Sequence, residues 1–423
     1  MVPLRVLISG ASVAGPALAY WLVRAGCKVT IVERSPTLRL AGQGIDVRDQ
    51  AREVIRRMHI FDTLRDRSSK EEGIKLVDAK NKTLARFPVD LESGDGDSPT
   101  CDIEILRGEL AKVLVDLTKD DVKYVFGDSI DSLQETNEQV TVGFANGTPT
   151  TSYDLVVAAD GMGSKTRSLA FSPDDVHIRS FNAYVSYFSV KPTQTDSMWA
   201  RVHWFKGGRN VAVRPDNQGR TRAFLTMTAY TDKDPRLAQY EKASRQGVQA
   251  QKDLTQQIFQ DADWEIERLL KGMHDADDYY MQHVAQVRMK RWSNGRVALL
   301  GDAGYAPSPF TGMGTSIAFI GAYVLAGEIS KQPDNIPAAL QSYEKVLKPY
   351  VESVQKVAPG IPWIVNPQSA LGVKILETVA RGVQLITSTW ISTAIQKLAN
   401  LLPIWNDDFV LPKYPAFEDA KEQ

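Results

Sequence analysis

The sequence is poor in cysteine, with only Cys27 and Cys101 among its 423 residues. Two cysteines make no disulfide framework, and neither belongs to a Cys-x-x-Cys or Cys/His cluster of the kind that binds a metal. This composition excludes a disulfide-stabilised secreted domain and predicts no metal site. It favours a reducing compartment, so we expect a cytoplasmic protein.

The sequence also has no excess of positive or negative charge. Lysine and arginine together number 50 and aspartate and glutamate 51, which leaves a formal net charge of -1. That balance provides no basic field for nucleic acid, so no nucleic-acid partner is predicted. Uncharged apolar runs of about 18 residues are also missing, so we predict no transmembrane segment. With 43% hydrophobic and 24% charged residues, the composition is typical of a globular protein.

A glycine-rich turn between a strand and a helix lies near the start of the chain. The apolar residues Leu4 to Ser9 predict a buried strand, and Gly10-Ala11-Ser12-Val13-Ala14-Gly15 follows it. An apolar helix from Pro16 to Ala25 and a second strand from Lys28 to Val32 come next, ending in Glu33. Such a β–α–β unit places a pyrophosphate against a helix N-terminus, where free N–H groups and the helix dipole favour negative charge.

This motif fits a dinucleotide site with one departure. Glu33 stands near the expected spacing for an acid that binds ribose hydroxyls, but Ser12 replaces the middle glycine of G-x-G-x-x-G. A small side chain at this position reduces how closely the backbone approaches the pyrophosphate. The motif alone does not choose between FAD and NAD, and it also fits a strand–helix turn without a ligand.

Two distant segments extend the pattern. A second buried strand, residues 153–159, ends in Asp160-Gly161, and a third, residues 296–300, ends in Gly301-Asp302. A turn from Pro309 through Gly312 to Gly314 then opens a helix over residues 315–329. The apolar residues of that helix occur on all of its sides, so we expect it to be buried.

These three motifs, in this order, resemble those of the group A flavoprotein monooxygenases, the family of para-hydroxybenzoate hydroxylase and salicylate hydroxylase. The resemblance covers roughly Leu4 to Tyr350 and is strongest to the tetracycline-destroying branch and to secondary-metabolite relatives. It implies an α/β fold: a Rossmann-like FAD-binding domain, an antiparallel-sheet substrate domain and a C-terminal helix. It also implies non-covalent FAD.

The resemblance assigns roles to residues around the cofactor. Asp302 would hydrogen-bond the ribityl chain, and the turn containing Pro309, Gly312 and Gly314 would direct N–H groups at the flavin pyrimidine edge. A helix N-terminus there would stabilise the negative charge of a reduced flavin. The other expected cofactor-binding residues are Gly10, Ser12, Ala14, Gly15 and Gly301 in the motif turns, Glu33 and Arg34 at the adenosine ribose, Arg107 at the phosphates, Arg39 and Asp46 beside the flavin, and Asp160.

The middle of the chain predicts the substrate domain. Between Phe181 and Tyr230 the pattern becomes alternating, aromatic and β-branched, with turns between the segments, which indicates an antiparallel sheet. In the family such a sheet lies opposite the flavin. Position along the family pattern makes Tyr184, Arg209 and Phe310 the substrate-pocket candidates, with His203 and Arg214 as weaker ones. The polar helical stretch from Asp234 to Met273 is expected to cover the outer face of this sheet.

Domain boundaries follow from these segments. We expect residues 1–178 and 286–360 to form the FAD-binding domain in two parts and residues 179–285 to form the substrate domain. Residues 361–423 are expected to hold a C-terminal bridging helix, with a helical pattern from Ala370 to Leu402. Amphipathicity leaves open a membrane-surface or dimer helix instead.

The expected activity follows from the cofactor, which carries the hard chemistry. NADPH or NADH would reduce FAD, O2 would form a C4a-hydroperoxyflavin, and an aromatic or polyketide-like small molecule would be oxygenated, in secondary metabolism or antibiotic modification. No catalytic side chain is required. An FAD-dependent oxidase or dehydrogenase and a non-catalytic flavin-binding protein remain alternatives, whereas the Trp-x-Trp-x-Ile-Pro motif of flavin halogenases is missing. Neither a monomer nor a homodimer is excluded.

Overall fold

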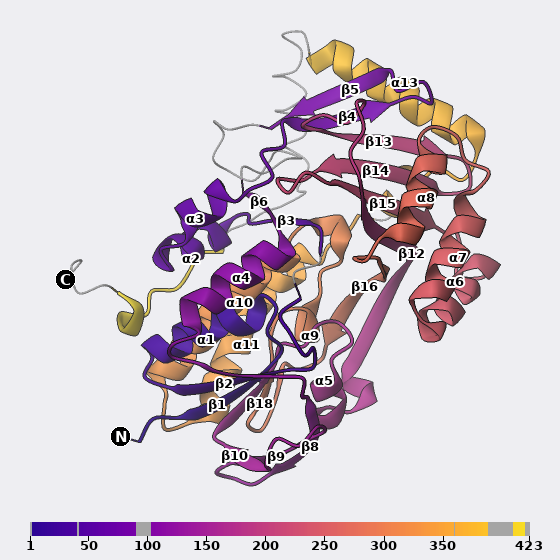
Figure 1. Ribbon diagram of the computed structural model, residues 1–423. Helices are drawn as coiled ribbons and strands as arrows, with labels where there is room; N and C mark the ends of the chain where they lie inside the picture. Colours follow the sequence, from indigo (N-terminus) through magenta and orange to yellow (C-terminus); the bar gives the residue numbers. More distant parts are fainter. Residues whose placement is uncertain (1, 40–41, 90–102, 359, 388–408, 419–423) are drawn as a thin grey trace.

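A computed structural model shows two lobes, each built on its own large sheet (Figure 1). The structure describes residues 2–39, 42–89, 103–358, 360–387 and 409–418. One lobe holds a six-stranded, mostly parallel sheet with helices packed against it. The other holds a seven-stranded sheet whose strands come mainly from the middle of the sequence. The predicted α/β class is confirmed.

The six-stranded sheet has the order β17-β18-β11-β1-β2-β7. The five strands from β18 to β7 run parallel to one another, and β17 adds an antiparallel edge strand beside β18. Parallel strands are covered on both faces and therefore read as continuous apolar runs. The strands are β1 (Arg5–Ser9), β2 (Lys28–Glu33), β7 (Lys123–Phe126), β11 (Leu155–Ala158), β17 (Ser293–Asn294) and β18 (Val297–Leu299).

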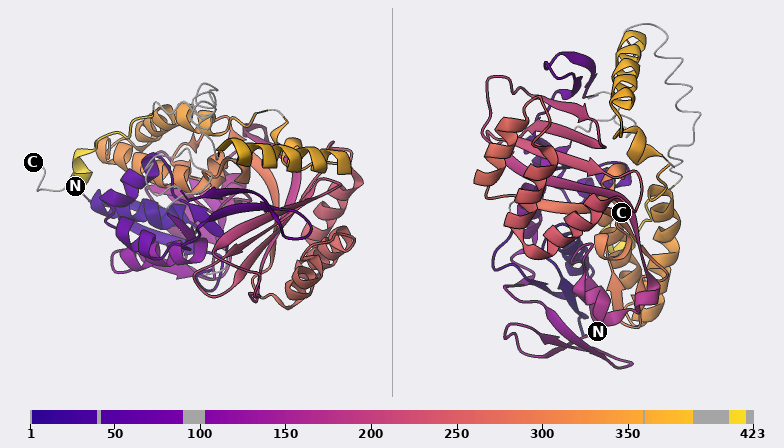
Figure 2. Two further views of the ribbon diagram at one scale, coloured as in Figure 1. Left: turned by 90° about the horizontal axis from the view of Figure 1, so that it is seen from above. Right: turned by 90° about the vertical axis from the view of Figure 1, so that its right-hand side faces the viewer.

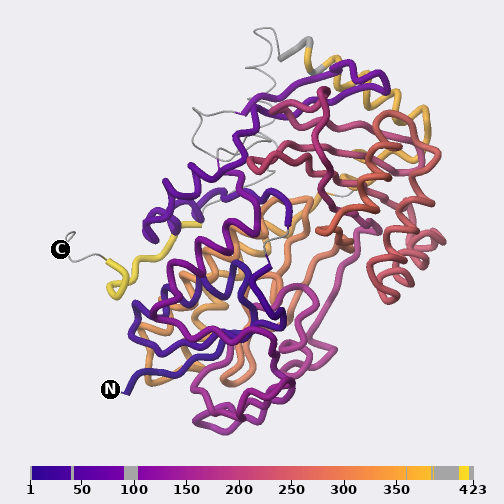
Figure 3. Tube along the Cα trace, viewed as in Figure 1, coloured from indigo at the N-terminus to yellow at the C-terminus, as the bar shows by residue number. Residues whose placement is uncertain are grey.

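Helices from both ends of the sequence pack on this sheet. Figure 3 shows the indigo N-terminal chain beside the orange segment that follows residue 297. The helices are α1 (Ala14–Arg24), α2 (Gln50–Arg57), α3 (Phe61–Asp66), α4 (Arg107–Thr118), α5 (Lys165–Ala170), α9 (Asp302–Tyr305), α10 (Gly314–Lys331) and α11 (Ile336–Val354). Helix α10 is buried along nearly its whole length, as its all-round apolar pattern predicts, because α1 and α11 both pack against it.

The seven-stranded sheet has the order β16-β12-β15-β14-β13-β4-β5. Its strands pair antiparallel except at β13 and β4, which run parallel. The strands are β4 (Gly73–Val77), β5 (Thr83–Pro88), β12 (Val176–Val190), β13 (Trp199–Phe205), β14 (Arg209–Pro215), β15 (Thr221–Thr228) and β16 (Tyr280–Met289). The antiparallel core is thus extended by a hairpin from the first part of the chain. The domain boundaries at residues 179 and 285 stay a prediction.

One face of this sheet is covered by three helices, α6 (Pro235–Gln246), α7 (Val248–Phe259) and α8 (Ile266–Asp275) (Figure 2). Phe188, Leu225 and Val211 on this face pack against Phe259 and Leu269 of the helices. We call it the outer face, and its helical cover agrees with the prediction for residues 234–273. The opposite side, the inner face, is turned toward the other lobe, since Phe310 and Val357 pack against its side chains.

Smaller elements complete the fold. An antiparallel sheet is formed by β8 (Ile130–Glu135), β9 (Val140–Phe144) and β10 (Thr151–Tyr153), and a two-stranded ladder by β3 (Gly44–Asp46) and β6 (Glu104–Leu106). Short helical turns are η1 (Pro173–Asp175), η2 (Pro309–Thr311), α12 (Ile361–Ile364) and η3 (Pro415–Phe417). No helix among the described residues is long and apolar enough to cross a membrane.

The C-terminal helix α13 (Ala370–Thr387) lies along the edge hairpin of the seven-stranded sheet (Figure 1). Ala380 packs against Leu84 and Ala85 of β5, and the Gln384 side-chain oxygen accepts a hydrogen bond from the Arg86 N–H at 2.6 Å. This part of the predicted C-terminal helix therefore contacts the sheet. Residues 388–402, which the prediction also includes, lie outside the described residues.

Candidate functional site

The three glycine motifs meet at one point of the parallel-sheet lobe. Gly10 has φ 110°, and a Cβ there would lie 2.5 Å from the Ala159 carbonyl oxygen, next to Asp160. Gly301 has φ 62°, and a Cβ there would lie 3.3 Å from the Ala14 Cβ. Positive φ and close approach both favour glycine. Segments more than 100 residues apart are therefore packed together with no room for larger side chains.

Two helices begin at this point with free backbone N–H groups. Helix α1 has Val13 and helix α10 has Met313 at the N-cap, and neither side chain caps its helix. Within the described chain, no acidic side chain lies in the first turn of either helix. Uncapped N-termini combine orphan donors with the positive end of the helix dipole. Both helix starts therefore suit negatively charged ligand groups.

Glu33 and Arg107 lie around the first motif. The Glu33 carboxylate accepts hydrogen bonds from the backbone N–H groups of Ala11 and Ser35, both at 2.9 Å. Arg107, at the start of α4, is exposed and donates from Nε to the Ser12 hydroxyl at 3.1 Å. The serine that replaces the middle glycine thus provides a hydrogen-bond partner for this arginine.

The remaining basic candidates, Arg34 and Arg39, follow β2 and are exposed. Their side chains lie on the surface near the end of that strand, so their positions alone assign them no role.

Asp302 lies beside the start of α10. Its side chain is exposed, yet burial by the surrounding protein raises the pKa of its carboxyl, and the charge of Arg107 acts in the opposite direction. A Cβ on Gly314 would lie 3.8 Å from Asp302 Oδ1, so the carboxylate is next to the α10 N-terminus.

Two predicted carboxylates already have protein partners. Asp160 accepts hydrogen bonds from the hydroxyls of Ser164 at 2.5 Å and Thr166 at 3.0 Å, at the start of α5. Asp46 accepts hydrogen bonds from both Nε (3.0 Å) and a terminal nitrogen (2.7 Å) of Arg48. The Arg48 backbone N–H in turn donates to Ser316 of α10 at 2.9 Å. Asp160 therefore organises the start of α5, and Asp46 organises the segment that contacts α10.

The turn before α10 carries further polar groups. Ser308 has φ 81°, outside the usual range for a residue other than glycine, and Gly312 has φ 65°. The Ser308 hydroxyl and the Gln43 side-chain oxygen are buried and have no hydrogen-bond partner within the described part of the chain. A buried polar atom without a partner is costly. Together with the two uncapped helices, these unsatisfied groups fit a bound dinucleotide such as FAD.

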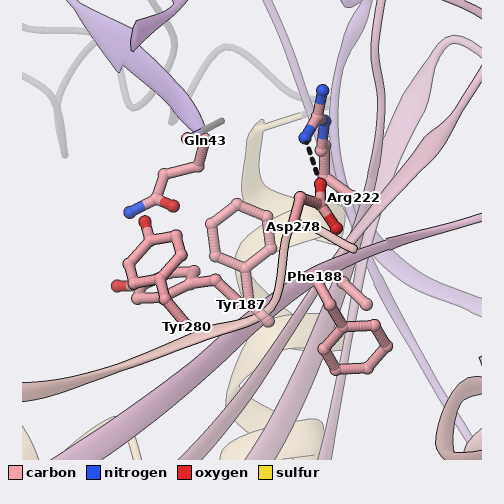
Figure 4. A pocket seen from close by; sticks show the side chains of 9 residues that line it. Gln43, Tyr187, Phe188, Arg222, Asp278 and Tyr280 are labelled. Carbon is pink, nitrogen blue, oxygen red and sulfur yellow. Dashed lines mark hydrogen bonds and ion pairs between the residues drawn. The ribbon is translucent and has the colours of Figure 1, made fainter. Parts of the chain in front are cut away.

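A hollow lies between the segment at Gly42 and Gln43 and the inner face. It is lined by Gly42, Gln43, Tyr187, Phe188, Arg222, Ala223, Phe224, Asp278 and Tyr280. Gln43 lies over the tyrosine rings, and the Arg222–Asp278 ion pair borders the other side (Figure 4). The Tyr187 and Tyr280 rings stack with centroids 4.8 Å apart. The hollow therefore offers aromatic walls with polar groups at its rim.

The structure separates the three substrate-pocket candidates. Phe310 packs edge-on against Phe181, at 5.4 Å between centroids, on the inner face. Tyr184 lies on the outer face and stacks on Tyr240 of α6 at 4.7 Å. The Arg209 guanidinium also lies on the outer side, where it donates to the Asp261 carboxylate at 2.5 Å.

The expectation that these residues share a pocket is therefore corrected for Tyr184 and Arg209. Successive side chains of a strand point to opposite faces, so a prediction that finds the strand can still choose the wrong face. Of the weaker candidates, His203 also lies on the outer face, packed against Trp264, whereas Arg214 lies on the inner face. Tyr187, Tyr280 and Gln43 were missed, although Gln43 belongs to the segment predicted to border the flavin.

Arg214 is the centre of a buried charge cluster between the lobes. Its guanidinium donates to Glu71 at 2.9 and 3.0 Å and to Glu104 at 2.5 Å. Burial raises the pKa of Glu104 to about 8, supported by the neighbouring charges of Glu71 and Asp46 and opposed by Arg214. The cluster holds more carboxylates than cations, so Glu104 retains a proton near neutral pH.

The comparisons with known proteins agree with this geometry. Residues 3–358 match the FAD binding domain family. The chain therefore belongs to this family, which defines it as an FAD-binding flavoprotein. It is 38% identical over 351 residues to a flavin-dependent monooxygenase of an unknown prokaryotic organism, covering 83% of this chain and 87% of that protein. An FAD-dependent monooxygenase of Sarocladium schorii is 33% identical, covering 98% and 99% of the two chains.

Solved structures give the same result. The crystal structure of the tetracycline destructase Tet(55) has a TM-score of 0.75 and 32% sequence identity, covering 97% of this chain and 99% of that one. Klebsiella pneumoniae HpxO complexed with FAD and uric acid, at 21% identity and a TM-score of 0.66, shares the fold. The predicted resemblance is confirmed, and the chain is a flavin-dependent monooxygenase.

Proposed function

We propose that this enzyme uses NADPH or NADH and O2 to oxygenate a polycyclic aromatic or polyketide-like small molecule. The observation that carries the proposal is the aromatic hollow on the inner face, which opens beside the residues that fit FAD. Bound FAD would supply electron transfer and oxygen activation. The relatives named above, fungal monooxygenases and a tetracycline destructase, support a role in secondary metabolism or antibiotic modification.

The chain's own residues would bind and orient the cofactor. The α1 N-terminus, with Gly10, Ser12, Ala14 and Gly15, would receive the pyrophosphate, and Arg107 would add a cation there. Glu33 and Arg34 would hold the adenosine ribose, with Arg39 nearby. Around the flavin we assign Gly301, Asp302, Pro309, Gly312 and Gly314, whose N–H groups and helix dipole stabilise negative charge, while Asp46 and Asp160 support the surrounding walls.

The substrate side would exclude water and position the reacting carbon. Aromatic residues of the inner face and Phe310 provide an apolar enclosure, which limits unproductive loss of activated oxygen to solvent. No side chain needs to act as a nucleophile. Two cysteines among 423 residues support a cytoplasmic location, and both a monomer and a homodimer are compatible with this chemistry.

Stopped-flow spectroscopy of the FAD-loaded protein tests the proposal. We expect NADPH or NADH to reduce the flavin, a polycyclic phenol to accelerate that reduction, and oxygenated product to form upon mixing with O2. A protein that binds FAD but is reduced by neither nucleotide with any phenol would instead be an oxidase or dehydrogenase. Bound yellow flavin without any turnover would indicate a non-catalytic flavoprotein.

A further inference from the structure

Two buried glutamines join the two lobes beside the turn before α10. Gln286 lies in β16, the edge strand of the seven-stranded sheet, and Gln355 follows α11. Their exposed fractions are 0% and 4%. Burying a carboxamide is costly unless its polar atoms find hydrogen-bond partners. The partners of these two side chains therefore indicate which part of the fold they stabilise.

The Gln355 side chain binds backbone carbonyls of two separate segments. Its Nε2 donates to the Val287 carbonyl of β16 at 2.9 Å. The same nitrogen donates to the carbonyls of Tyr305 and Ala306, both at 3.2 Å. The Ala306 carbonyl also accepts a hydrogen bond from the Val287 N–H at 3.1 Å. Gln355 therefore holds the segment before Pro307 against the edge of the seven-stranded sheet.

Gln286 extends this contact to the next residue of the segment. Its Nε2 donates to the carbonyls of Pro307 and Gln355, both at 2.9 Å. Its Oε1 accepts hydrogen bonds from two nitrogens of Arg288, at 3.3 and 3.0 Å. Because a guanidinium can only donate, Arg288 determines which end of the Gln286 amide faces the carbonyls. We call Gln286, Gln355 and Arg288 the glutamine clamp.

The segment held by the glutamine clamp leads directly into a strained turn. Ser308, the residue after Pro307, has φ 81°. Such a conformation persists in a residue other than glycine only where surrounding contacts determine it. The clamp binds three consecutive carbonyls before Ser308, and α10 begins a few residues later, at Gly314. The clamp therefore fixes the start of this turn relative to the seven-stranded sheet.

From these contacts we infer that Gln286 and Gln355 are positioning residues for the flavin, because they determine where the turn from Pro309 to Gly314 directs its N–H groups. The inference rests on the proposed function, which places the flavin at the α10 N-terminus. Reduction adds negative charge to the flavin, so N–H groups and a helix dipole directed at it stabilise the reduced form more than the oxidised form. Displacing the turn therefore weakens the binding of reduced flavin more than that of oxidised flavin.

Reductive titration of the FAD-loaded protein with dithionite and a reference dye, without NADPH or NADH, tests the inference separately from turnover. The midpoint potential and the dissociation constant of oxidised FAD together give the affinity for reduced flavin. For Gln355→Met and Gln286→Met, we expect the affinity for reduced flavin to fall at least about tenfold more than that for oxidised flavin. This difference lowers the midpoint potential of a two-electron couple by about 30 mV. Neither substitution removes a charge.

Asn294→Leu is the matched control for a loss of stability alone. Asn294 Nδ2 donates to the Ala170 carbonyl at 2.7 Å, so this variant also removes a carboxamide–carbonyl hydrogen bond between distant segments. Asn294 pairs with Val297, at the end of β18 opposite Gly301. We expect its midpoint potential to equal that of the parent. Equal weakening of both flavin forms in the two glutamine variants would show a structural role only and overturn the inference.

Arg288→Lys provides the test if the glutamine variants do not fold. Arg288 is half-buried, and lysine keeps the charge but lacks the two nitrogens that contact Gln286 Oε1 together. We expect a shift of the midpoint potential in the same direction as in the glutamine variants, but a smaller one. An unchanged potential in this variant would contradict the clamp.

The two proposals fail in different ways. A lowered midpoint potential in the glutamine variants, with a parent that neither nucleotide reduces, would support the inference and reject the monooxygenase cycle. Turnover by the parent, with unchanged potentials in the glutamine variants, would support the cycle and reject the inference.

Discussion

At the scale of single residues, burial and neighbouring charges determine what a carboxylate does. Glu104 and Asp302 are both carboxylates, and surrounding protein raises the pKa of each. Glu104 is buried and held by Arg214, whereas Asp302 is exposed beside the start of α10. One is therefore a structural group that keeps a proton, and the other is accessible to a ligand.

Glu104→Gln should make the protein less sensitive to alkaline pH. The folded-state pKa of about 8 lies above the unfolded value of about 4.3, so the stability that protonated Glu104 contributes is lost as pH rises toward 8. We expect the variant to match the parent at about pH 4 and to be more stable by on the order of 5 kcal/mol at about pH 8.5.

Thermal or urea unfolding across that pH range measures the effect. Glu138→Gln, at an exposed site, serves as the control and should follow the parent at every pH. A Glu104→Gln variant that loses stability equally at both ends of the range would show that the carboxyl is ionised in the folded protein.

Asp302→Ala should weaken FAD binding. Losing a hydrogen bond to a charged group costs about 1.5–3 kcal/mol, so we expect roughly a tenfold to hundredfold higher dissociation constant. Flavin fluorescence upon dilution or dialysis reports the released cofactor. Asp121→Ala, at an exposed site after α4, is the control, and equal flavin retention by the two variants would exclude Asp302 from the cofactor site.

At the scale of elements, the glycines of the motif turns allow a helix to lie close to the strand before it, because glycine has no Cβ. A Cβ on Gly15 would collide with the Gly10 carbonyl oxygen and approach Ile8 of β1. Helix α1 can therefore lie close to β1 and direct its N-terminus at the turn only with glycine at this position. Gly301, between α1 and α10, is restricted mainly by its positive φ of 62°.

Gly15→Val should both destabilise the fold and reduce flavin content. Displacing α1 from β1 is an overpacking change that costs about 1–3 kcal/mol, and it also moves the free N–H groups that we assign to the pyrophosphate. Gly163→Ala is the matched control, because a Cβ there meets nothing within 4 Å. Normal stability and full flavin content in Gly15→Val would contradict this packing.

At the scale of the whole molecule, buried charge joins segments distant in sequence. Arg214 of β14 holds Glu71 before β4 and Glu104 of β6, so the cluster links the seven-stranded sheet to the ladder beside the cofactor lobe. Helix α13 adds a further contact at the sheet edge through Ala380 and Gln384. The relation between the lobes thus depends on contacts between several chain segments.

Arg214→Met should destabilise the protein by about 3 kcal/mol, because removing one partner leaves buried charge uncompensated. The triple variant Arg214→Met, Glu71→Gln, Glu104→Gln should regain most of that loss, since neutral amides carry no such charge. Denaturant unfolding of the parent, the single and the triple variant measures both effects. A triple variant no more stable than the single one would indicate lost packing as the cause.

The sequence by itself determined the parts of this protein that depend on local pattern. The strand before Gly10, the strands before Asp160 and Gly301, and the buried helix after Gly314 all follow from apolar runs bounded by glycine, and the structure confirms them. These signals are local because a positive φ restricts the residue type at one position, and burial on all sides restricts it at each position of a strand or helix.

Only the tertiary structure decided which side chains meet. Tyr184 and Tyr187 lie on one strand with similar local sequence, yet one faces α6 and the other the hollow, because the fold determines which side of the sheet the helices cover. Arg214 finds its carboxylates more than 100 residues away, and no local pattern encodes that pairing. The substrate hollow depends on the strand register of the seven-stranded sheet and on the packing of the segment at Gln43 against it, and both arise from contacts between distant segments.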